Sequence, residues 1–242
     1  MAVTLDHLGE LVSDDKDAKM SRDVCLETLR AISNEKLESP LSVKLTQLGL
    51  GLDIRQELCV ENMAAIIDYA SQYNIWVNID MEDFRRCEAI LEIFREVSSW
   101  YERVQTVIQA YLYRSKADVQ WLADMGSNIR LVKGAYQEFS NVAYPKKADV
   151  DANYKQLMDI HLPSRGLTSI ATHDEAMIAH AKEVIHKHSL SRHQYEFQML
   201  YGIRHDLQAT LVEEGYPLRI YVPYGAIGMG TLCGGLRSAL PI

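Results

Sequence analysis

Short runs of apolar and β-branched residues alternate with longer amphipathic stretches along most of the chain. Eight of these runs predict strands, and their starts lie roughly 23 to 40 residues apart, the spacing of one strand, one helix and their loops. Several runs are almost entirely apolar, as is typical of strands covered on both faces in a parallel sheet. The predicted strands cover residues 3–6, 41–45, 76–80, 106–110, 129–132, 169–171, 196–199 and 219–222.

The stretches between these runs have the periodicity of amphipathic helices. Two predicted apolar faces consist of Cys59, Met63, Ile66, Ile67 and Ala70, and of Cys87, Ile90, Leu91 and Phe94. We interpret the sulfur-containing side chains in these faces as core packing and not as metal or cofactor contacts. Ser115 and Thr172 stand where capping residues would open helices, and Gly215 followed by Pro217 can close another.

Eight strands alternating with helices predict an α/β fold, a (β/α)8 TIM-type barrel, over residues 1–225. A doubly wound open sheet is the alternative that the pattern leaves open. No GxGxxG motif follows the first strand or any other, which argues against that alternative. In a barrel, functional residues lie at the C-terminal ends of the strands.

Composition narrows the class of protein further. The chain has 242 residues, of which 48% are apolar and 24% are charged, an ordinary globular composition. Its 25 Lys and Arg against 33 Asp and Glu give a net charge of −8, which argues against a nucleic acid partner. No apolar run approaches the ~20 residues that span a bilayer. The four cysteines form no CxxC pair, so we expect no disulfide scaffold or zinc site, and a reducing cytoplasm.

Polar and ionisable side chains follow almost every predicted strand, which predicts a binding or catalytic site at that end of the barrel. Lys133 with Gly134 and Ala135 offers an ammonium group and an unobstructed backbone, which suit a phosphate or pyrophosphate. Arg130 is expected to face inward, beside an electron-rich ring or a carboxylate. Lys44 or Lys133 could alternatively form a Schiff base with a carbonyl substrate.

The histidines divide into two groups. Four of them lie in or after one predicted helix and are interpreted as a solvated face, so no metal site is predicted there: His180, His186, His188 and His193. His173 directly follows a predicted strand, where it could stack on a ligand or form a hydrogen bond with it.

Six motifs occur in order along the chain: SVKLT at 42–46, IDME at 79–82, RLVKGAY at 130–136, ATH at 171–173, EFQMLYG at 196–202 and YVPYG at 221–225. Together they resemble the proline dehydrogenases, FAD-dependent barrel enzymes of proline catabolism. The similarity extends from Val3 to Gly225 and is greatest to the short monofunctional bacterial form.

The resemblance implies oxidation of L-proline to Δ1-pyrroline-5-carboxylate, with hydride transfer to flavin N5. It makes Asp80 and Arg130 catalytic, and it assigns substrate binding to Lys44, Leu131, Tyr136 and Tyr221. The implied FAD contacts are Met81, Gln109, Lys133, Gly134, Ala135, Thr172 and His173. It further implies a membrane quinone as electron acceptor and a cytoplasmic protein that can associate with the inner face of the membrane without inserting stably. The sequence leaves the oligomeric state open.

The sequence departs from the family pattern at both ends. The leading helices of the family are missing, and an irregular tail at 226–242 replaces the eighth helix with its adjacent Arg-Arg pair, which grips the substrate carboxylate. Codons permitted for this tail can be read in a shifted frame as an amphipathic segment that contains an Arg-Arg pair. We therefore hypothesise that one nucleotide was lost just after Gly225, in the gene or in its sequencing. We expect this chain to be impaired as an enzyme, and an inactive remnant is the third alternative.

Overall fold

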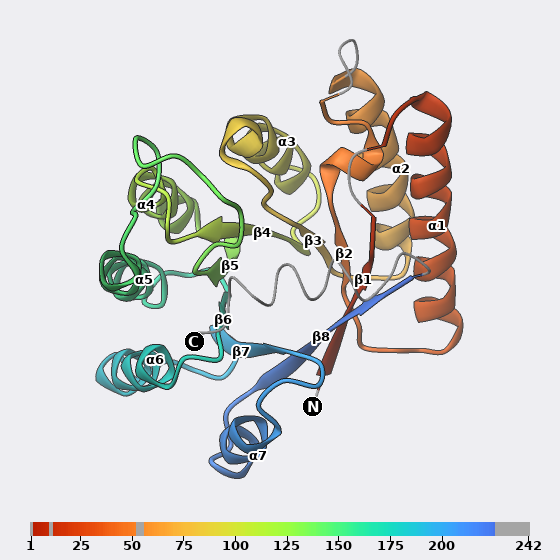
Figure 1. The fold of residues 1–242 in the computed structure, drawn as a ribbon. Helices are drawn as coiled ribbons and strands as arrows, with labels where there is room; N and C mark the ends of the chain where they lie inside the picture. Colours follow the sequence, from red (N-terminus) through yellow and green to blue (C-terminus); the bar gives the residue numbers. More distant parts are fainter. Residues whose placement is uncertain (1, 10–11, 52–55, 226–242) are drawn as a thin grey trace. The chain divides into compact units, whose positions relative to one another are not determined.

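The structure is a computed structural model that describes residues 2–9, 12–51 and 56–225 (Figure 1). These described residues form eight strands: β1 (Ala2–His7), β2 (Leu41–Val43), β3 (Val77–Ile79), β4 (Val104–Gln109), β5 (Asn128–Val132), β6 (Thr168–Ala171), β7 (Tyr195–Leu200) and β8 (Leu218–Tyr224). The α-helices between them are α1 (Asp15–Asn34), α2 (Gln56–Gln72), α3 (Cys87–Ser98), α4 (Ser115–Met125), α5 (Lys147–His161), α6 (Glu175–Lys187) and α7 (His205–Glu213). Two short 3-10 helices are η1 (Leu45–Leu48) and η2 (Phe84–Arg86).

The strands follow one another in chain order from β1 to β8, which is the order of a (β/α)8 barrel. Parallel pairing is seen, for example, between β2 and β3 and between β6 and β7. The predicted fold class is confirmed, and the doubly wound alternative is wrong because the strand order never reverses. The second strand ends earlier than predicted because Lys44 leaves it and serves as the N-cap residue of η1.

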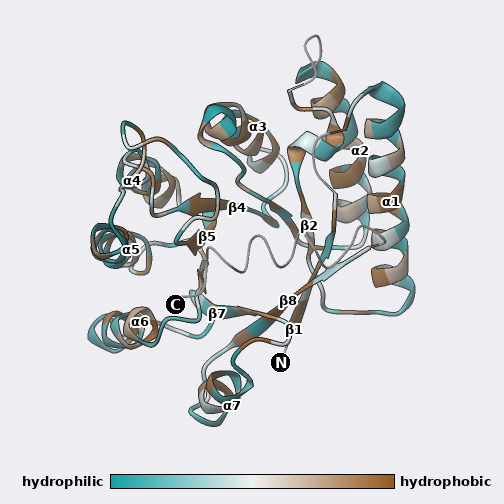
Figure 2. Ribbon diagram, viewed as in Figure 1, coloured by the Kyte–Doolittle hydropathy of each residue, from teal (hydrophilic) through white to brown (hydrophobic). Residues whose placement is uncertain are grey.

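The described residues form two compact units, which we treat separately. The first unit holds Ala2–Thr106 together with the end of β8, from Val222 onward. In it α1, α2 and η1 pack against one another. The two apolar helix faces predicted from the sequence are confirmed, since their residues are buried on α2 and α3. Figure 2 shows the same division along these helices, which carry both hydrophobic and hydrophilic residues.

The second unit holds Val107–Tyr221. Its helices pack in sequence, α4 against α5 and α5 against α6. Tyr154 on α5 is fully buried, and its hydroxyl donates a hydrogen bond to the carbonyl oxygen of Leu131 at 2.8 Å. This bond ties the helix to the strand β5 beneath it, because a buried hydroxyl must find an acceptor.

Helix ends differ in detail from the sequence prediction. Helix α4 begins at Ser115, but the Ser115 hydroxyl donates to the carbonyl oxygen of Leu112 and does not cap the helix. Helix α6 is capped by Asp174, whose carboxylate accepts from the backbone N–H of Ala176. Thr172 instead accepts from the backbone N–H of Asp174. Both predicted capping side chains are therefore wrong: Asp174, which is nearer to the helix, caps α6, and the described N-cap residue of α4, Arg114, makes no side-chain capping bond.

Buried polar side chains occur on most of the described strands, and on β1 and β7 they occupy alternate positions. Successive strand residues point to opposite faces of a sheet, so these side chains share one face. On β7, buried Glu196 and Gln198 alternate with the buried apolar residues Tyr195, Phe197 and Met199. Buried polar residues in the first unit include Thr4, Asp6, Ser42, Asn78, Asp80 and Gln105, and in the second Arg130, Ser169, Glu196 and Gln198. Barrel strands usually carry branched apolar residues on this face, so a polar face points to a polar ligand.

None of the helices within the described ranges is both long and apolar enough to cross a membrane.

We expect His161 to make the stability of the second unit depend on pH. Its side chain is fully buried; Nδ1 accepts from the hydroxyl of Thr168 at 2.7 Å, and Nε2 donates to the carbonyl oxygen of Ser127 at 3.0 Å. Burial lowers the pKa of His161 from 6.5 to about 4, although the bond to Ser127 acts in the opposite direction. The folded state therefore prefers the neutral ring, and its contribution is complete above pH 6.5.

This contribution is lost as the pH falls from 6.5 to about 4, which amounts to about 3 kcal/mol in the free energy of unfolding. Urea unfolding of the wild type and of His161→Gln across that range measures it. The variant should be less stable at pH 7 and should lose less stability on acidification. Parallel curves for the two proteins would contradict the assignment.

Candidate functional site

Lys44 forms the centre of a buried ionic cluster in the first unit. Its Nζ atom lies 3.1 Å from both carboxylate oxygens of Asp6 and 3.1 Å from Oδ2 of Asp80. The Ser42 hydroxyl donates to Oδ1 of Asp80 at 2.7 Å. Parallel pairing brings these residues together, since Asp6 registers with Ser42 on the next strand and Ser42 with Asn78 on the strand after that. Two of the predicted site residues, Lys44 and Asp80, are thus in direct contact.

The carboxylates of this cluster are buried, and hydrogen bonds hold the backbone next to them. Asp6 and Asp80 are 3% and 7% exposed. Burial and the nearby charge of Lys44 lower the pKa of His7, which directly follows Asp6. Met81 is buried beside Asp80, and the next residue, Glu82, accepts a 3.0 Å hydrogen bond from the backbone N–H of Thr46. These hydrogen bonds therefore join the segments that follow β2 and β3.

Arg130 and Tyr221 meet in the second unit. The guanidinium carbon of Arg130 lies 4.9 Å from the centre of the Tyr221 ring, within the range of a cation–π contact. Arg130 is only 6% exposed. Leu131 is fully buried and points to the opposite face of β5, because neighbouring strand residues alternate. The geometry thus keeps Arg130 and Tyr221 together and turns Leu131 away from them, into the core.

Lys133 does not offer its ammonium group freely to an anion. Its Nζ atom lies 2.5 Å from Asp151 and 2.5 Å from Asp174, and Lys147 contacts the same two carboxylates. Although burial acts in the opposite direction, the hydrogen bond from Lys133 lowers the pKa of Asp174 to about 2. Burial alone would raise the pKa of Asp151, but the hydrogen bonds from Lys133 and Lys147 lower it. A phosphate at this point would compete with two carboxylates for Lys133.

Gly134 is required by close packing against an aromatic ring. Its φ angle is +119°, and a Cβ atom at this position would overlap the ring of Tyr111. The Tyr111 ring therefore fills the space on one side of Gly134, and a phosphate contact of this backbone stays a prediction. Ala135, the following residue, is exposed, and Tyr136 is partly exposed.

Thr172 and His173 lie directly after β6. Nε2 of His173 accepts a hydrogen bond from the backbone N–H of Leu200 at 3.0 Å, so the proton of the neutral ring is on Nδ1. Burial, with a smaller contribution from Arg204, lowers the pKa of His173. The ring is therefore neutral near pH 7 and presents Nδ1–H as a donor. Gln109, at the end of β4, is 3% exposed.

Several polar residues near the predicted ones were given no site role by the sequence reasoning. Period-two alternation in the predicted strands could have found those on the polar face: Asp6, Ser42, Ser169, Glu196, Gln198 and Arg219. No local pattern could have paired Asp151 with Lys133, since 18 residues and a loop separate them.

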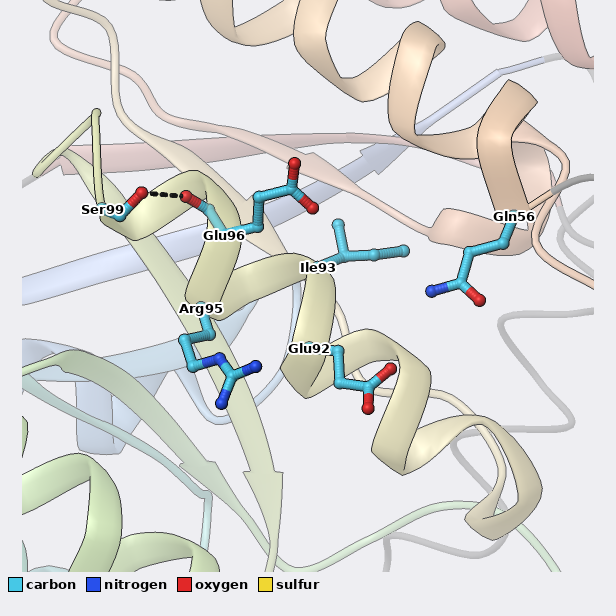
Figure 3. A pocket seen from close by; sticks show the side chains of 6 residues that line it. All are labelled: Gln56, Glu92, Ile93, Arg95, Glu96 and Ser99. Atoms are coloured by element: carbon cyan, nitrogen blue, oxygen red, sulfur yellow. Dashed lines mark hydrogen bonds between the residues drawn. The ribbon is translucent and has the colours of Figure 1, made fainter.

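Other features of the described residues lie apart from these side chains. A hollow of about 490 Å³ in the first unit is lined by side chains from the start of α2 and from α3, including Gln56 and Arg95, and contains none of the predicted site residues (Figure 3). The residues that the structure describes contain no cluster of three His, Cys, Asp or Glu side chains arranged to hold a metal ion.

Comparison with known proteins agrees with the six motifs. The family model for proline dehydrogenase matches residues 1–231. Proline dehydrogenase 2 of Bacillus subtilis is 44% identical over 225 residues, which cover 93% of this chain and 74% of that protein. The proline dehydrogenase of Deinococcus radiodurans is 42% identical over 228 residues, with the same two coverages.

The fold agrees with a solved structure as well. Proline utilization A (PutA) from Bdellovibrio bacteriovorus, in a structure inactivated by N-propargylglycine, superposes with a TM-score of 0.89 at 26% identity. The match covers 98% of this chain and 29% of that much longer one. Because the family model matches residues 1–231 of the 242 in this chain, the chain belongs to the proline dehydrogenase family.

Proposed function

We propose that this chain oxidises L-proline to Δ1-pyrroline-5-carboxylate with FAD as the bound cofactor. The observation that carries the proposal is the match to the proline dehydrogenase family over residues 1–231. Two cations, Lys44 directly after β2 and the buried Arg130 on β5, suit a small anionic substrate and an electron-rich cofactor ring.

The residues of the second unit fit a flavin in three respects. His173 presents a ring N–H donor beside Thr172, both directly after β6. Arg130 is a buried cation that can face an electron-rich ring. The side-chain oxygen of Gln198 is a buried acceptor for which the described residues provide no donor. Gln109, Ala135 and the Lys133 ammonium group are proposed to complete the cofactor site. Met81, in the first unit, stays a predicted flavin contact.

FAD supplies the acceptor for the hydride that leaves the ring carbon next to the proline nitrogen. Lys44 is proposed to attract the proline carboxylate, with Asp6 and Asp80 holding its ammonium group in a fixed position. Tyr221 and Tyr136 are proposed to shape the substrate pocket. Leu131, which is buried on the other face of β5, stays a prediction for this pocket.

The alternative of a Schiff-base lyase has no support in the comparisons. Lys44 and Lys133 each contact two carboxylates, so both side chains are held in ion pairs. A Schiff-base lysine must instead present a neutral amine to the substrate.

A membrane quinone is the proposed electron acceptor, and the interior of the cell is the proposed location. Within the described ranges, the side chains of Cys25, Cys59 and Cys87 are buried thiols outside any disulfide, which suits a reducing compartment.

The purified protein, reconstituted with FAD, tests the function directly. We expect it to retain a visible flavin spectrum that L-proline bleaches without oxygen, and N-propargylglycine to inactivate it as it inactivates the PutA relative. Even a weakly active chain gives this single-turnover bleaching, because the measurement needs no acceptor. A protein that binds no flavin, or a bound flavin that proline never reduces, would overturn the proposal.

A further inference from the structure

A buried hydrogen-bond network joins β6, β7 and β8 in the second unit, with Glu196 at its centre. Oε1 of Glu196 accepts from the Ser169 hydroxyl at 3.0 Å, from Nε2 of Gln198 at 2.6 Å and from Nε of Arg219 at 2.9 Å. Glu196 and Gln198 are 9% and 3% exposed. The carboxylate has three donors and remains well satisfied when one of them is removed.

Glu196 determines how the side-chain amide of Gln198 is oriented. A carboxylate accepts hydrogen bonds and cannot donate them, so the NH2 group of Gln198 must face Glu196 and the Oε1 atom must face away. No group among the described residues donates to that Oε1 atom. Buried acceptors are almost always paired, so this oxygen calls for a donor from outside the described chain.

The neighbours of Gln198 indicate which ligand supplies that donor. The backbone N–H of Thr172 donates to the carbonyl oxygen of Gln198 at 3.3 Å, and the His173 ring bonds to the N–H of Leu200, two residues further along β7. Thr172 and His173 belong to the proposed cofactor site.

We infer that the Oε1 atom of Gln198 accepts a hydrogen bond from the N–H group of the bound flavin ring. This inference rests on the proposed function and adds a residue to its cofactor site. An oxidised isoalloxazine ring has a single N–H group, in its imide portion, and one fixed acceptor matches it. The hydrogen bond to Glu196 fixes the orientation of the Gln198 amide, so the flavin N–H group faces the Oε1 atom of Gln198 and not its NH2 group.

Gln198→Met tests the inference because it keeps the length of the side chain and removes both polar atoms. We expect the dissociation constant of FAD to rise about tenfold, the loss typical of one well-formed hydrogen bond in a buried site. The melting temperature of the apoprotein should stay the same or rise, because the variant also removes a buried acceptor that has no donor. The absorption spectrum of the bound flavin should shift.

Gln208→Met is the matched control. Gln208 is also buried in the second unit, but its Nε2 atom donates to the carbonyl oxygens of Leu200 and Ile203. This variant should lower the melting temperature of the apoprotein and leave the FAD dissociation constant unchanged.

The outcomes separate this inference from the proposed function. Wild-type protein that binds no FAD would defeat both. Wild-type protein that binds FAD, with Gln198→Met binding it equally well, would defeat the Gln198 contact alone. A Gln198→Met apoprotein of lowered stability with unchanged FAD affinity would show that the residue has only a structural role.

Discussion

Replacing residues 226–242 with the segment encoded in the shifted frame should raise kcat/KM for proline at least about a hundredfold. That segment reads Arg-Asp-Trp-Asn-Gly-Tyr-Phe-Met-Arg-Arg-Leu-Ala-Glu-Arg-Pro-Ala-Asn. The present tail has one arginine, Arg237, and four glycines. These residues lie outside the described part of the chain, so the expectation rests on the sequence and on the family resemblance.

The physical reason lies in the charges around the substrate carboxylate. In the buried cluster, the single ammonium group of Lys44 faces the two carboxylates of Asp6 and Asp80, so these three groups together carry one negative charge. An adjacent arginine pair adds two positive charges and bidentate hydrogen bonds that a single ammonium group cannot supply. Truncating one partner of such a buried charged contact costs about 2–5 kcal/mol.

Steady-state kinetics of the replaced chain against the present one measure the gain. The matched control carries the same new segment with both adjacent arginines changed to methionine, and it should recover any packing but little activity. Equal activity of the replaced chain and this control would refute the role of the arginine pair. The coding DNA provides a separate check, since its codons after Gly225 must spell the segment one frame away.

Lys44→Met should destabilise the first unit and abolish most of the activity together. The substitution leaves Asp6 and Asp80 buried without their shared cation, which costs about 3–5 kcal/mol in the free energy of unfolding. The expected loss in kcat/KM is at least about a hundredfold, because the proposed partner of the proline carboxylate is removed. Denaturant unfolding and proline kinetics on one protein preparation measure both effects.

A double variant distinguishes the two effects. Asp6→Asn combined with Lys44→Met removes one of the stranded carboxylate charges, so it should recover part of the stability and none of the activity. Lys116→Met removes a lysine that is exposed on α4 and should change neither quantity measurably. Recovery of activity in the double variant would show that Lys44 acts only through folding.

The sequence by itself determined the order of elements, the barrel class and the apolar helix faces. These features follow from local periodicity: strands repeat every two residues, helices every 3.6, and their alternation leaves few topologies. The motif RLVKGAY at 130–136 likewise marks the residues at one strand end through local sequence alone. Local patterns determine the boundaries of strands and helices less well. The predicted strand ends were right to within a few residues, but the residue that caps α6 is Asp174 and not the predicted Thr172.

Only the tertiary structure decided which charges meet. Lys44 lies 38 residues after Asp6 and 36 residues before Asp80 in the chain. The register of β1, β2 and β3 brings the three residues into one cluster. The same is true of Lys133 with Asp151 and Asp174, and of the Tyr111 ring that occupies the space beside Gly134. Periodicity reports which face a side chain takes, but its partner depends on strand register and helix packing, which arise between segments far apart in the chain.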